Sequence, residues 1–283
     1  MDFNKYLEEF IDLAIREDIG DGDHTSQACI PPEKIGKAKL LVKQEGILSG
    51  SEIAQHVFKK LDPEVQIEHY LFDGQSIKIN DIIFLVTGKV LALLQAERLV
   101  LNLMQRMSGI ATQTHEYVTK LEGLSTKILE TRKTTPGMRL LEKMAVRHGG
   151  GTNHRLGLYD MIMIKDNHID FAGGIVEAIK QVKEYLQRNN KNLKVICEVR
   201  SLEDIEKVLE IGGVDRILLD NFSTELTKQA VGLVNGRIPT ESSGGITIDS
   251  LRSYAECGVD YISVGALTHQ IKSLDLSLKA IDY

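Results

Sequence analysis

The 283-residue chain lacks the marks of several protein classes. Its three cysteines, Cys29, Cys197 and Cys257, form no CxxC pair, which argues against a disulfide scaffold or structural zinc and fits a reducing compartment. No apolar run reaches the roughly 18–20 residues of a membrane span. The start, MDFN, lacks the basic and apolar stretches of a signal peptide, and neither low-complexity linkers nor solenoid repeats are present. We therefore expect a globular, cytoplasmic protein.

Basic residues are fewer than acidic ones, 34 against 40, and the net charge of −6 argues against a general nucleic-acid coat. This charge is unevenly spread. From Thr131 to His168, seven basic residues accompany only three acidic ones, which gives this segment a charge of +4. A local cationic zone in an acidic protein predicts a small, highly anionic ligand rather than a long polyanion.

The first part of the chain mixes helix and strand patterns. Apolar residues at helical spacing predict an N-terminal amphipathic helix, which the turn Gly20-Asp21-Gly22-Asp23 ends. We interpret this acidic segment as a capped turn, because it lacks the spacing of a calcium loop. A long helical pattern runs from Leu91 to Thr119. The strands expected before it are Lys39–Val42, Val65–Tyr70, Ile77–Ile79 and Ile82–Val86.

The second part of the chain repeats a strand-then-helix pattern. The last four strand-like runs end 22, 22 and 23 residues apart, at Glu198, Asp220, Ser242 and Gly265, which is the length of one βα unit. Six such units predict a parallel α/β barrel with fewer than the usual eight strands, and its sites would lie at the carboxyl ends of the strands. The expected strands are Ile128–Thr131, Met161–Ile164, Val195–Cys197, Ile217–Leu219, Ile238–Glu241 and Tyr261–Val264.

Cations gather at two of these expected strand ends. Arg132 and Lys133 follow one strand, and Lys165 ends another. Arginine grips a carboxylate or phosphate with two hydrogen bonds, while lysine adds a compact charge. These residues therefore predict an anion site at the barrel mouth.

A glycine-rich loop precedes His154 and Arg155. Because three successive glycines, Gly149–Gly151, let backbone N–H groups approach a ligand, we expect this loop to contribute to anion binding. His148 and His154 lack a carboxylate or cysteine at a spacing that suits a metal site.

Two further clusters lie at the last strand ends. Glu198 and Asp220 form a carboxylate pair that can hold Mg²⁺, stabilise a developing cation, act as general acid and base, or balance nearby lysines. The spacing leaves these interpretations open. Small residues in Ser242-Ser243-Gly244-Gly245 and Gly265-Ala266 are typical of a phosphate cradle built from backbone N–H groups.

Together these motifs resemble the quinolinate phosphoribosyltransferase family, also called carboxylating nicotinate-nucleotide pyrophosphorylases. The resemblance covers nearly the whole chain, from Gly20 to His269, and is most specific from Thr131 to His168. The segments ERLVLNLMQRMSGIAT, EVRSLEDIE, LLDNFS and ESSGGI support it in the expected order.

The resemblance implies transfer of phosphoribose from phosphoribosyl pyrophosphate to the nitrogen of quinolinate. Pyrophosphate and CO₂ are released, and nicotinate mononucleotide is formed in de novo NAD biosynthesis. The implied fold is an N-terminal open α/β sandwich over residues 1–112 and an incomplete parallel α/β barrel over 113–266, with residues 267–283 returning toward the first domain. The resemblance further implies Mg²⁺ and a homodimer or higher homo-oligomer, in which a neighbouring N-terminal domain completes each active site. It implies neither a nucleic-acid nor a membrane partner.

Carried over by motif, the resemblance assigns residues to each ligand. The quinolinate set is Arg132, His154, Arg155 and Lys165, with Arg98 supplied by the partner subunit. The phosphoribosyl pyrophosphate set is Lys133, Glu198, Asp220, Ser243, Gly244, Gly245, Val264, Gly265 and Ala266. Lys133, Lys165, Glu198 and Asp220 would be catalytic, and Glu198 and Asp220 would also hold Mg²⁺.

Three rival interpretations remain. One is a paralogue of the same fold that is associated with molybdenum transport, and another is a nicotinate phosphoribosyltransferase without decarboxylation. The third is a sensor that binds phosphoribosyl ligands without turnover. The full cation set favours quinolinate, and the retained acids and lysines argue against a sensor.

Overall fold

The computed structural model describes residues 2–281, which form two compact units. The N-terminal unit contains the chain up to His115, Thr135–Gly150 and the segment from Gln270 onward, and the C-terminal unit contains Glu116–Thr134 and Gly151–His269. An antiparallel sheet in the first and a parallel sheet in the second confirm the predicted α/β class. The domain boundaries at 112 and 266 stay a prediction.

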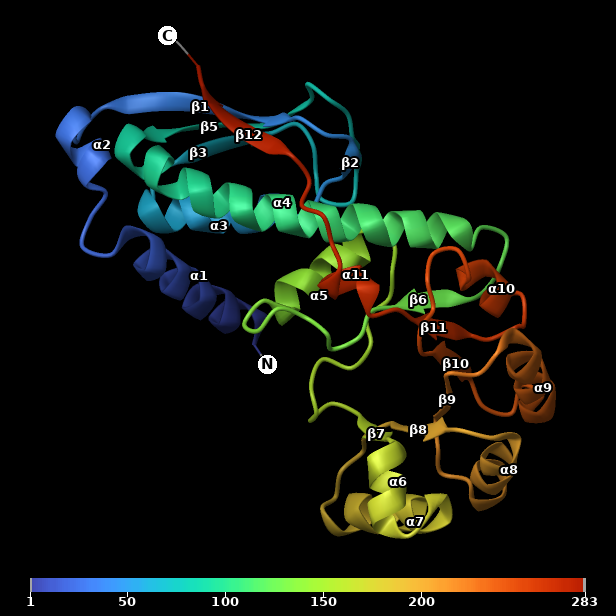
Figure 1. The fold of residues 1–283 in the computed structure, drawn as a ribbon. Coiled ribbons are helices and arrows are strands. Elements are labelled where there is room, and N and C mark those ends of the chain that lie inside the picture. The colour runs from blue at the N-terminus through green and yellow to red at the C-terminus, as the bar shows by residue number, and fades with distance from the viewer. Residues whose placement is uncertain (1, 282–283) are drawn as a thin grey trace. The chain divides into compact units, whose positions relative to one another are not determined.

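The N-terminal unit is built on a four-stranded antiparallel sheet in the order β12-β1-β5-β3 (Figure 1). Helices α3 and α4 lie on one face of this sheet, where Phe58 of α3 packs edge-on against Phe84 of β5 with ring centroids 6.0 Å apart. The strands are β1 (Ile35–Val42), β3 (Gln66–His69), β5 (Ile82–Lys89) and β12 (Leu276–Ala280), with a separate pair, β2 (Gly46–Ile47) and β4 (Ser76–Ile77). The helices are α1 (Phe3–Ile19), α2 (His24–Cys29), α3 (Ser51–Leu61), α4 (Val90–Lys120) and α5 (Arg139–His148).

Capping residues explain where the first two helices begin and end. The Asp2 side chain accepts the N–H of Asn4 at 3.0 Å, and Gly20, with a φ of 58°, ends α1. Asp23 accepts the N–H of Ser26 at 3.0 Å and so caps α2. The acidic segment is therefore the capped turn that was predicted.

The last strand, β12, completes the sheet of the N-terminal unit. It pairs antiparallel with β1, and Leu278 lies opposite Leu40, both buried. Strands β1 and β12, which are far apart in the sequence, therefore share one hydrogen-bonded sheet and one apolar layer.

The C-terminal unit is an incomplete parallel barrel, as predicted. Its six strands run in the order β6-β11-β10-β9-β8-β7, and among residues 2–281 no strand pairing joins β6 to β7. The strands are β6 (Lys127–Leu129), β7 (Ile162–Ile164), β8 (Val195–Val199), β9 (Arg216–Asp220), β10 (Thr240–Ser243) and β11 (Tyr261–Ser263). The helices are α6 (Asp166–Ala172), α7 (Ile175–Arg188), α8 (Leu202–Ile211), α9 (Thr224–Val234), α10 (Leu251–Ala255) and α11 (Ala266–His269).

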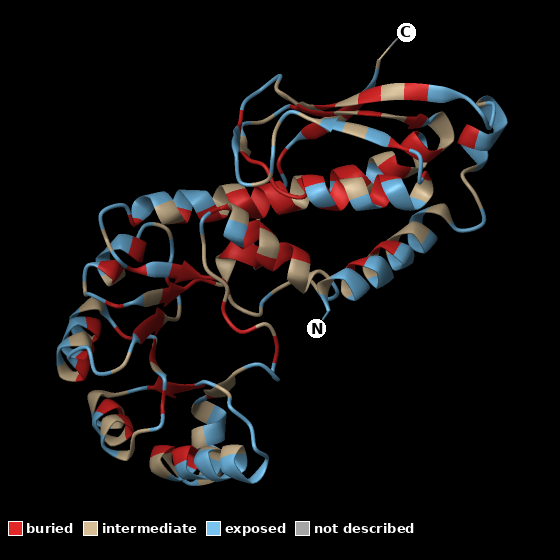
Figure 2. Ribbon diagram, turned by 180° about the vertical axis from the view of Figure 1, so that it is seen from behind, coloured by how far each residue is buried: buried red, intermediate tan, exposed pale blue. Residues whose placement is uncertain are grey.

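The strands form the core of this unit and the helices cover it (Figure 2). All five residues of β8 are buried, whereas α8 buries only Ile205 and Val208 on one stripe. Ser201 caps α8 by accepting the N–H of Asp204 at 3.1 Å, and Gly212 ends it. The carboxyl end of the buried strand β8 therefore leads into a capped helix.

Strand β10 departs from the sequence prediction. The expected run Ile238–Glu241 contains Pro239, which has no N–H to donate, and the strand instead covers Thr240–Ser243. Its polar residues are buried because β9 and β11 pair with it on both sides. The position of the strand in the sheet outweighs its polar sequence, and this places Glu241 inside the unit.

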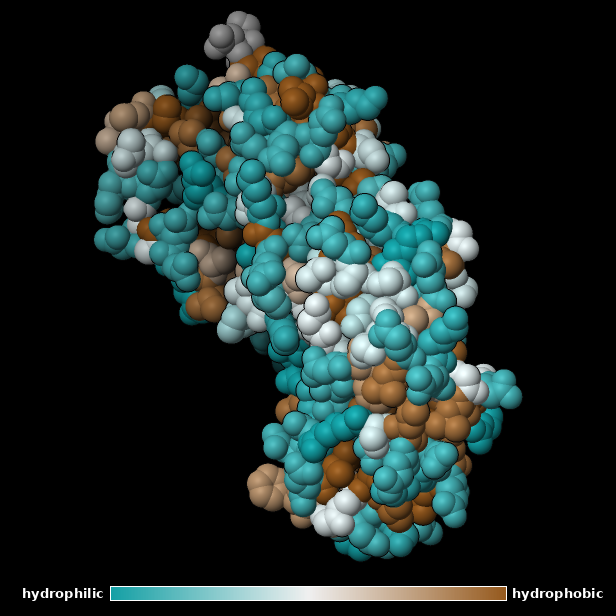
Figure 3. Space-filling view, turned by 45° about the vertical axis from the view of Figure 1, so that its right-hand side comes forward, coloured by the Kyte–Doolittle hydropathy of each residue, from teal (hydrophilic) through white to brown (hydrophobic). Residues whose placement is uncertain are grey.

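The surface shows no broad apolar band on the face drawn in Figure 3, where hydrophilic side chains interrupt smaller apolar patches. Within residues 2–281, every helix is too short or too polar to cross a membrane.

Candidate active site

Charged and small residues meet where the parallel strands of the C-terminal unit end. Asp220 at the end of β9 lies opposite Ser243 at the end of β10, and the β7–β8 and β8–β9 registers align the neighbouring ends. The predicted residues at this edge are Lys133, Lys165, Glu198, Asp220, Ser243 and Gly265. The spacing argument therefore identified one edge of one sheet.

The carboxylate pair at this edge, Glu198 and Asp220, places two negative charges near one another. Burial raises the pKa of Glu198, the charge of Asp220 raises it further, and Lys165 opposes both effects. Within residues 2–281, no three histidine, cysteine or acidic side chains gather into a metal site. Two hard oxygen donors without a third protein ligand fit Mg²⁺, which usually keeps several waters and takes further oxygens from phosphates.

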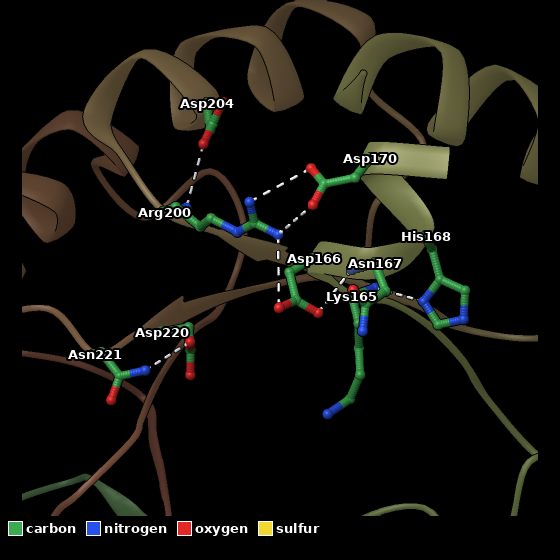
Figure 4. A network of polar contacts seen from close by, with 9 residues as sticks. All are labelled: Lys165, Asp166, Asn167, His168, Asp170, Arg200, Asp204, Asp220 and Asn221. Atoms are coloured by element: carbon green, nitrogen blue, oxygen red, sulfur yellow. Dashed lines mark hydrogen bonds and ion pairs between the residues drawn. The ribbon is translucent and has the colours of Figure 1, made fainter. Parts of the chain in front are cut away.

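Ion pairs of Arg200 tie the end of β8 to α6 (Figure 4). Arg200 follows β8, and its guanidinium lies 3.3 Å from the Asp170 carboxylate and 3.6 Å from that of Asp166. On β9, the Asn221 side chain donates to Asp220 at 2.7 Å. Sequence analysis missed Arg200 and Asn221, although each lies within two residues of a predicted acid.

Lys165 begins α6 at the end of β7. Its backbone N–H donates to Nδ1 of His168 at 3.0 Å, which fixes the first turn of the helix. Figure 4 shows the Lys165 side chain extending away from Arg200. The ammonium is therefore directed away from the Arg200 ion pairs, and its charge acts on Glu198.

Two arginines form the cationic part of the site. Burial and the neighbouring charge of Arg132 lower the pKa of Arg155, while Asp160 raises it. Arg155 Nη1 donates to the carbonyl of Met161 at 3.1 Å. The Nε atom of Arg132 is buried and has no hydrogen-bond partner. A buried guanidinium N–H without an acceptor, beside a second arginine, is the arrangement that a bound carboxylate would satisfy.

His154 contacts two buried glutamates. Its backbone N–H donates to Glu130 at 2.8 Å, and its Nε2 lies 3.4 Å from Glu241 Oε1. The other oxygen of Glu241 accepts from Arg216 at 2.8 Å. Burial raises the pKa of Glu241, but His154 and Arg216 outweigh it and hold this pKa below its ordinary value.

The two predicted phosphate loops follow β10 and β11. Gly244, with a φ of 96°, leaves no room for a side chain, because a Cβ there would collide with Asn221. A Cβ at Gly265 would lie 3.0 Å from the Lys133 side chain and 2.9 Å from that of His269. Lys133 is held next to this loop, since its carbonyl accepts from Thr268 Oγ1 at 2.9 Å. Both loops therefore need glycine for close approach.

The remaining members of the predicted set take different positions. Val264 is buried and donates its N–H to the carbonyl of Leu129, and Ala266 is the first residue of α11. Gly245, with a φ of 61°, follows Gly244 in the turn after β10. Arg98 is exposed on α4 in the N-terminal unit.

The glycine-rich loop differs in part from the prediction. A Cβ at Gly149 would collide with the carbonyl of Ala111 and lie 2.7 Å from Thr114, so this glycine allows α5 to end close to α4. His148 Nδ1 lies 2.8 Å from the Ser49 hydroxyl. Packing therefore accounts for Gly149, and His148 is engaged within the N-terminal unit.

The N-terminal unit contains a cavity of about 370 Å³ between β1, the first turns of α4 and β12. Its walls are mainly aliphatic, and none of the predicted site residues lines it. Two of its lining residues, Ile35 and Leu94, are large apolar side chains that remain about half exposed.

Two family models match the chain. The model described as "Quinolinate phosphoribosyl transferase, N-terminal domain" matches residues 23–108, and the corresponding C-terminal domain model matches residues 110–279. Together they cover most of the sequence in the order of the two sheets.

Curated relatives and solved structures agree with this match. The chain is 44% identical to quinolinate phosphoribosyltransferase [decarboxylating] 2, mitochondrial, of Nicotiana glauca, over 96% of the chain and 82% of the relative. It is also 44% identical to the probable nicotinate-nucleotide pyrophosphorylase [carboxylating] of Bacillus subtilis, over 96% and 92%. The structure of the nicotinate-nucleotide pyrophosphorylase from Francisella tularensis matches with a TM-score of 0.90 and 38% identity, covering 99% of this chain and 98% of that one.

Proposed function

Because the chain belongs to the quinolinate phosphoribosyltransferase family, we propose that it converts quinolinate and phosphoribosyl pyrophosphate into nicotinate mononucleotide, pyrophosphate and CO₂ in NAD biosynthesis. One local observation carries the assignment of the dicarboxylate. Arg132 and Arg155 lie together, and the buried Nε of Arg132 has no acceptor. An anion with two adjacent carboxylates supplies the missing acceptor for Arg132 and a negative charge for the neighbouring Arg155.

Quinolinate binding rests on the cations of the strand ends. Arg132 and Arg155 bind the carboxylates, Lys165 adds a third positive charge, and Arg98 of the partner subunit completes the set. His154 belongs to this set through its contact with Arg155, whose backbone N–H donates to His154 Nδ1 at 2.6 Å.

Phosphoribosyl pyrophosphate occupies the neighbouring strand ends. Ser243, Gly244 and Gly245 receive the 5′-phosphate together with the loop Val264–Ala266, because backbone N–H groups in small-residue turns at strand ends can approach a phosphate closely. Lys133 lies beside Gly265 and faces the pyrophosphate. Glu198 and Asp220 bind the ribose hydroxyls and hold Mg²⁺, which, when bound, neutralises charge on the departing pyrophosphate.

Positioning and electrostatics then carry the reaction. The bond between ribose C1 and the pyrophosphate oxygen breaks, and the carbon becomes oxocarbenium-like beside Glu198 and Asp220. The ring nitrogen of quinolinate, aligned by its carboxylates, supplies the electron pair of the new bond. The ring nitrogen is then positive, so the adjacent carboxylate leaves as CO₂, and its electron pair stays on the ring carbon until a proton arrives.

The working unit in this proposal is a homodimer or higher homo-oligomer. Arg98 is exposed on α4, one residue after Glu97, which lines the aliphatic cavity with the half-exposed Leu94. Exposed apolar side chains beside a free cation favour a surface that docks on another subunit. A partner seated there would bring Arg98 to the strand ends of its neighbour.

One assay tests the function. The protein is incubated with quinolinate, phosphoribosyl pyrophosphate and Mg²⁺, while nicotinate mononucleotide and CO₂ are measured together. Equal amounts of both products are expected. Product from nicotinate without CO₂ would instead indicate the non-decarboxylating transferase. Binding of phosphoribosyl pyrophosphate without any turnover would indicate the sensor or the transport-associated paralogue.

The cytoplasm remains our proposed location. Plant relatives at 43–44% identity carry "mitochondrial" and "chloroplastic" in their names, so the family also works in organelles. Cell fractionation with an antibody to the chain would decide between these compartments.

A further inference from the structure

A chain of contacts links Tyr261, Arg216, Glu241 and His154 in the C-terminal unit. Arg216, the first residue of β9, stacks 3.9 Å above the Tyr261 ring of β11. Its Nη1 donates to Glu241 Oε2 at 2.8 Å, and Glu241 Oε1 lies 3.4 Å from His154 Nε2. Glu241 is fully buried, and the side chain of His154 is 3% exposed. The proposed reaction assigns no role to Arg216, Glu241 or Tyr261.

The contacts of His154 determine which of its ring nitrogens carries the proton. Nδ1 accepts the backbone N–H of Arg155 at 2.6 Å, so Nδ1 presents its lone pair. The proton therefore lies on Nε2, the atom that faces Glu241. Nδ1 is thus hydrogen-bonded to the backbone of Arg155, and Nε2 lies in ion-pair range of Glu241.

Resting on the proposed function, we propose that Glu241 is a positioning residue for quinolinate binding, which acts through His154 on Arg155. Glu241 holds the His154 ring with Nε2–H toward itself. Nδ1 then accepts from the backbone of Arg155 and keeps that guanidinium beside Arg132. His154 thereby orients Arg155.

Two donors converge on Glu241, and this explains why a carboxylate is needed there. Arg216 takes one oxygen and His154 takes the other. A glutamine has one acceptor oxygen and an NH₂ group, so one of the two donors would face another donor. If that donor is His154, its proton would move to Nδ1 and oppose the N–H of Arg155. Buried unsatisfied groups of this kind are costly, so the ring or the Arg155 backbone must shift.

The test compares Glu241→Gln with Asp260→Asn. Asp260 is a matched control because it accepts the N–H of Thr240, at the opposite end of the same strand, at 2.8 Å. For Glu241→Gln we expect the KM for quinolinate to rise about tenfold, as for loss of about 1.4 kcal/mol. The KM for phosphoribosyl pyrophosphate should change less than twofold. Asp260→Asn should leave both KM values unchanged.

A spectroscopic readout separates positioning from general destabilisation. In ¹⁵N NMR spectra, the His154 ring, assigned by its loss in His154→Gln, should show protonated Nε2 and unprotonated Nδ1 in the unliganded wild-type protein. Glu241→Gln should change this pattern, and Asp260→Asn should preserve it. Should Glu241→Gln fail to fold, Glu241→Asp, which keeps both oxygens on a shorter side chain, is expected to keep the tautomer while still raising the KM for quinolinate.

Two results would overturn the proposal. One is an unchanged KM for quinolinate in a folded Glu241→Gln or Glu241→Asp protein. The other is protonated Nδ1 in the wild-type spectrum. Failure of the proposed function would look different, because the wild-type protein would then make no nicotinate mononucleotide while the NMR spectrum still reported the tautomer.

Discussion

The two ends of the barrel strands use the same residue type for opposite purposes. At the amino ends, Asp215 accepts the N–H of Val195 at 2.7 Å, and Asp260 accepts that of Thr240 at 2.8 Å. At the carboxyl ends, Glu198 and Asp220 face one another, and the pKa of Glu198 is raised. The first pair satisfies backbone donors where strands begin. The second pair is kept in an unfavourable environment that a ligand would relieve.

This difference follows from the direction of parallel strands. Every strand of such a sheet exposes N–H groups at one edge and leads into the helix loops at the other. Carboxylates at the first edge accept from strand N–H groups, whereas Glu198 and Asp220 at the second edge accept from Asp166 and Asn221, in the loops and helices that follow the strands. Substitutions at the two ends should therefore separate stability from activity.

The largest effect is expected from Glu198→Gln and Asp220→Asn. Each removes negative charge beside the developing cation, so turnover should fall by on the order of a hundredfold or more. The melting temperature should stay the same or rise, because a repulsive charge has gone. Product formation and thermal unfolding measure the two quantities. Near-normal turnover in both variants would contradict a role for these two carboxylates in the reaction.

Mixed oligomers test whether the carboxyl ends are complete within one chain. Arg98→Ala and Arg132→Ala should each be inactive, because each site needs both arginines from different subunits. Random mixing into dimers should restore roughly a quarter of the sites. Turnover before and after subunit exchange measures this recovery. Hybrids that form without any recovery would contradict a shared site.

Arg155→Lys should raise the KM for quinolinate by about tenfold, since lysine keeps the charge and loses the two-pronged geometry. The KM for phosphoribosyl pyrophosphate should remain within twofold. Arg188→Lys on the exposed face of α7 is the matched control and should change neither value. Steady-state kinetics with each substrate varied in turn measure both KM values. An equal rise in both would show that Arg155 does not act on quinolinate alone.

The amino ends should respond in stability alone. Asp215→Asn weakens the acceptor for Val195, and we expect a loss of about 1 kcal/mol in the free energy of unfolding. Turnover at a temperature well below unfolding should stay within twofold of wild type. Denaturant titration measures the free energy of unfolding. A large loss of turnover without a loss of stability would contradict the purely structural role of the amino-end carboxylates.

The smallest effect is a pH dependence from Glu198. Because its pKa is raised in the folded protein, the folded state favours the protonated carboxyl group, and this stabilisation is lost as the pH rises through the raised pKa. Wild type should therefore lose stability relative to Glu198→Gln as the pH rises from below the ordinary glutamate value. Unfolding curves of both proteins across this range measure the difference, which should vanish at the acidic end.

Much of this arrangement could be predicted from sequence because it depends on spacing. The intervals of 22 and 23 residues placed Glu198, Asp220 and the glycine loops at one sheet edge. Strand β10 was misplaced because Thr240–Ser243 is polar, and only pairing with both neighbours makes it a buried strand. Glu241 was missed because its partners, Arg216 and His154, come from segments that are distant in the sequence.

The return of β12 to β1 also determines the order in which the protein can be completed during synthesis. Leu278 can pair with Leu40 only after the intervening barrel has been synthesised, so the sheet of the N-terminal unit is completed last. Until then, β1 presents an unpaired edge, the kind of surface that promotes aggregation of a nascent chain. Loss of the C-terminal residues through a premature stop would therefore damage the beginning of the protein.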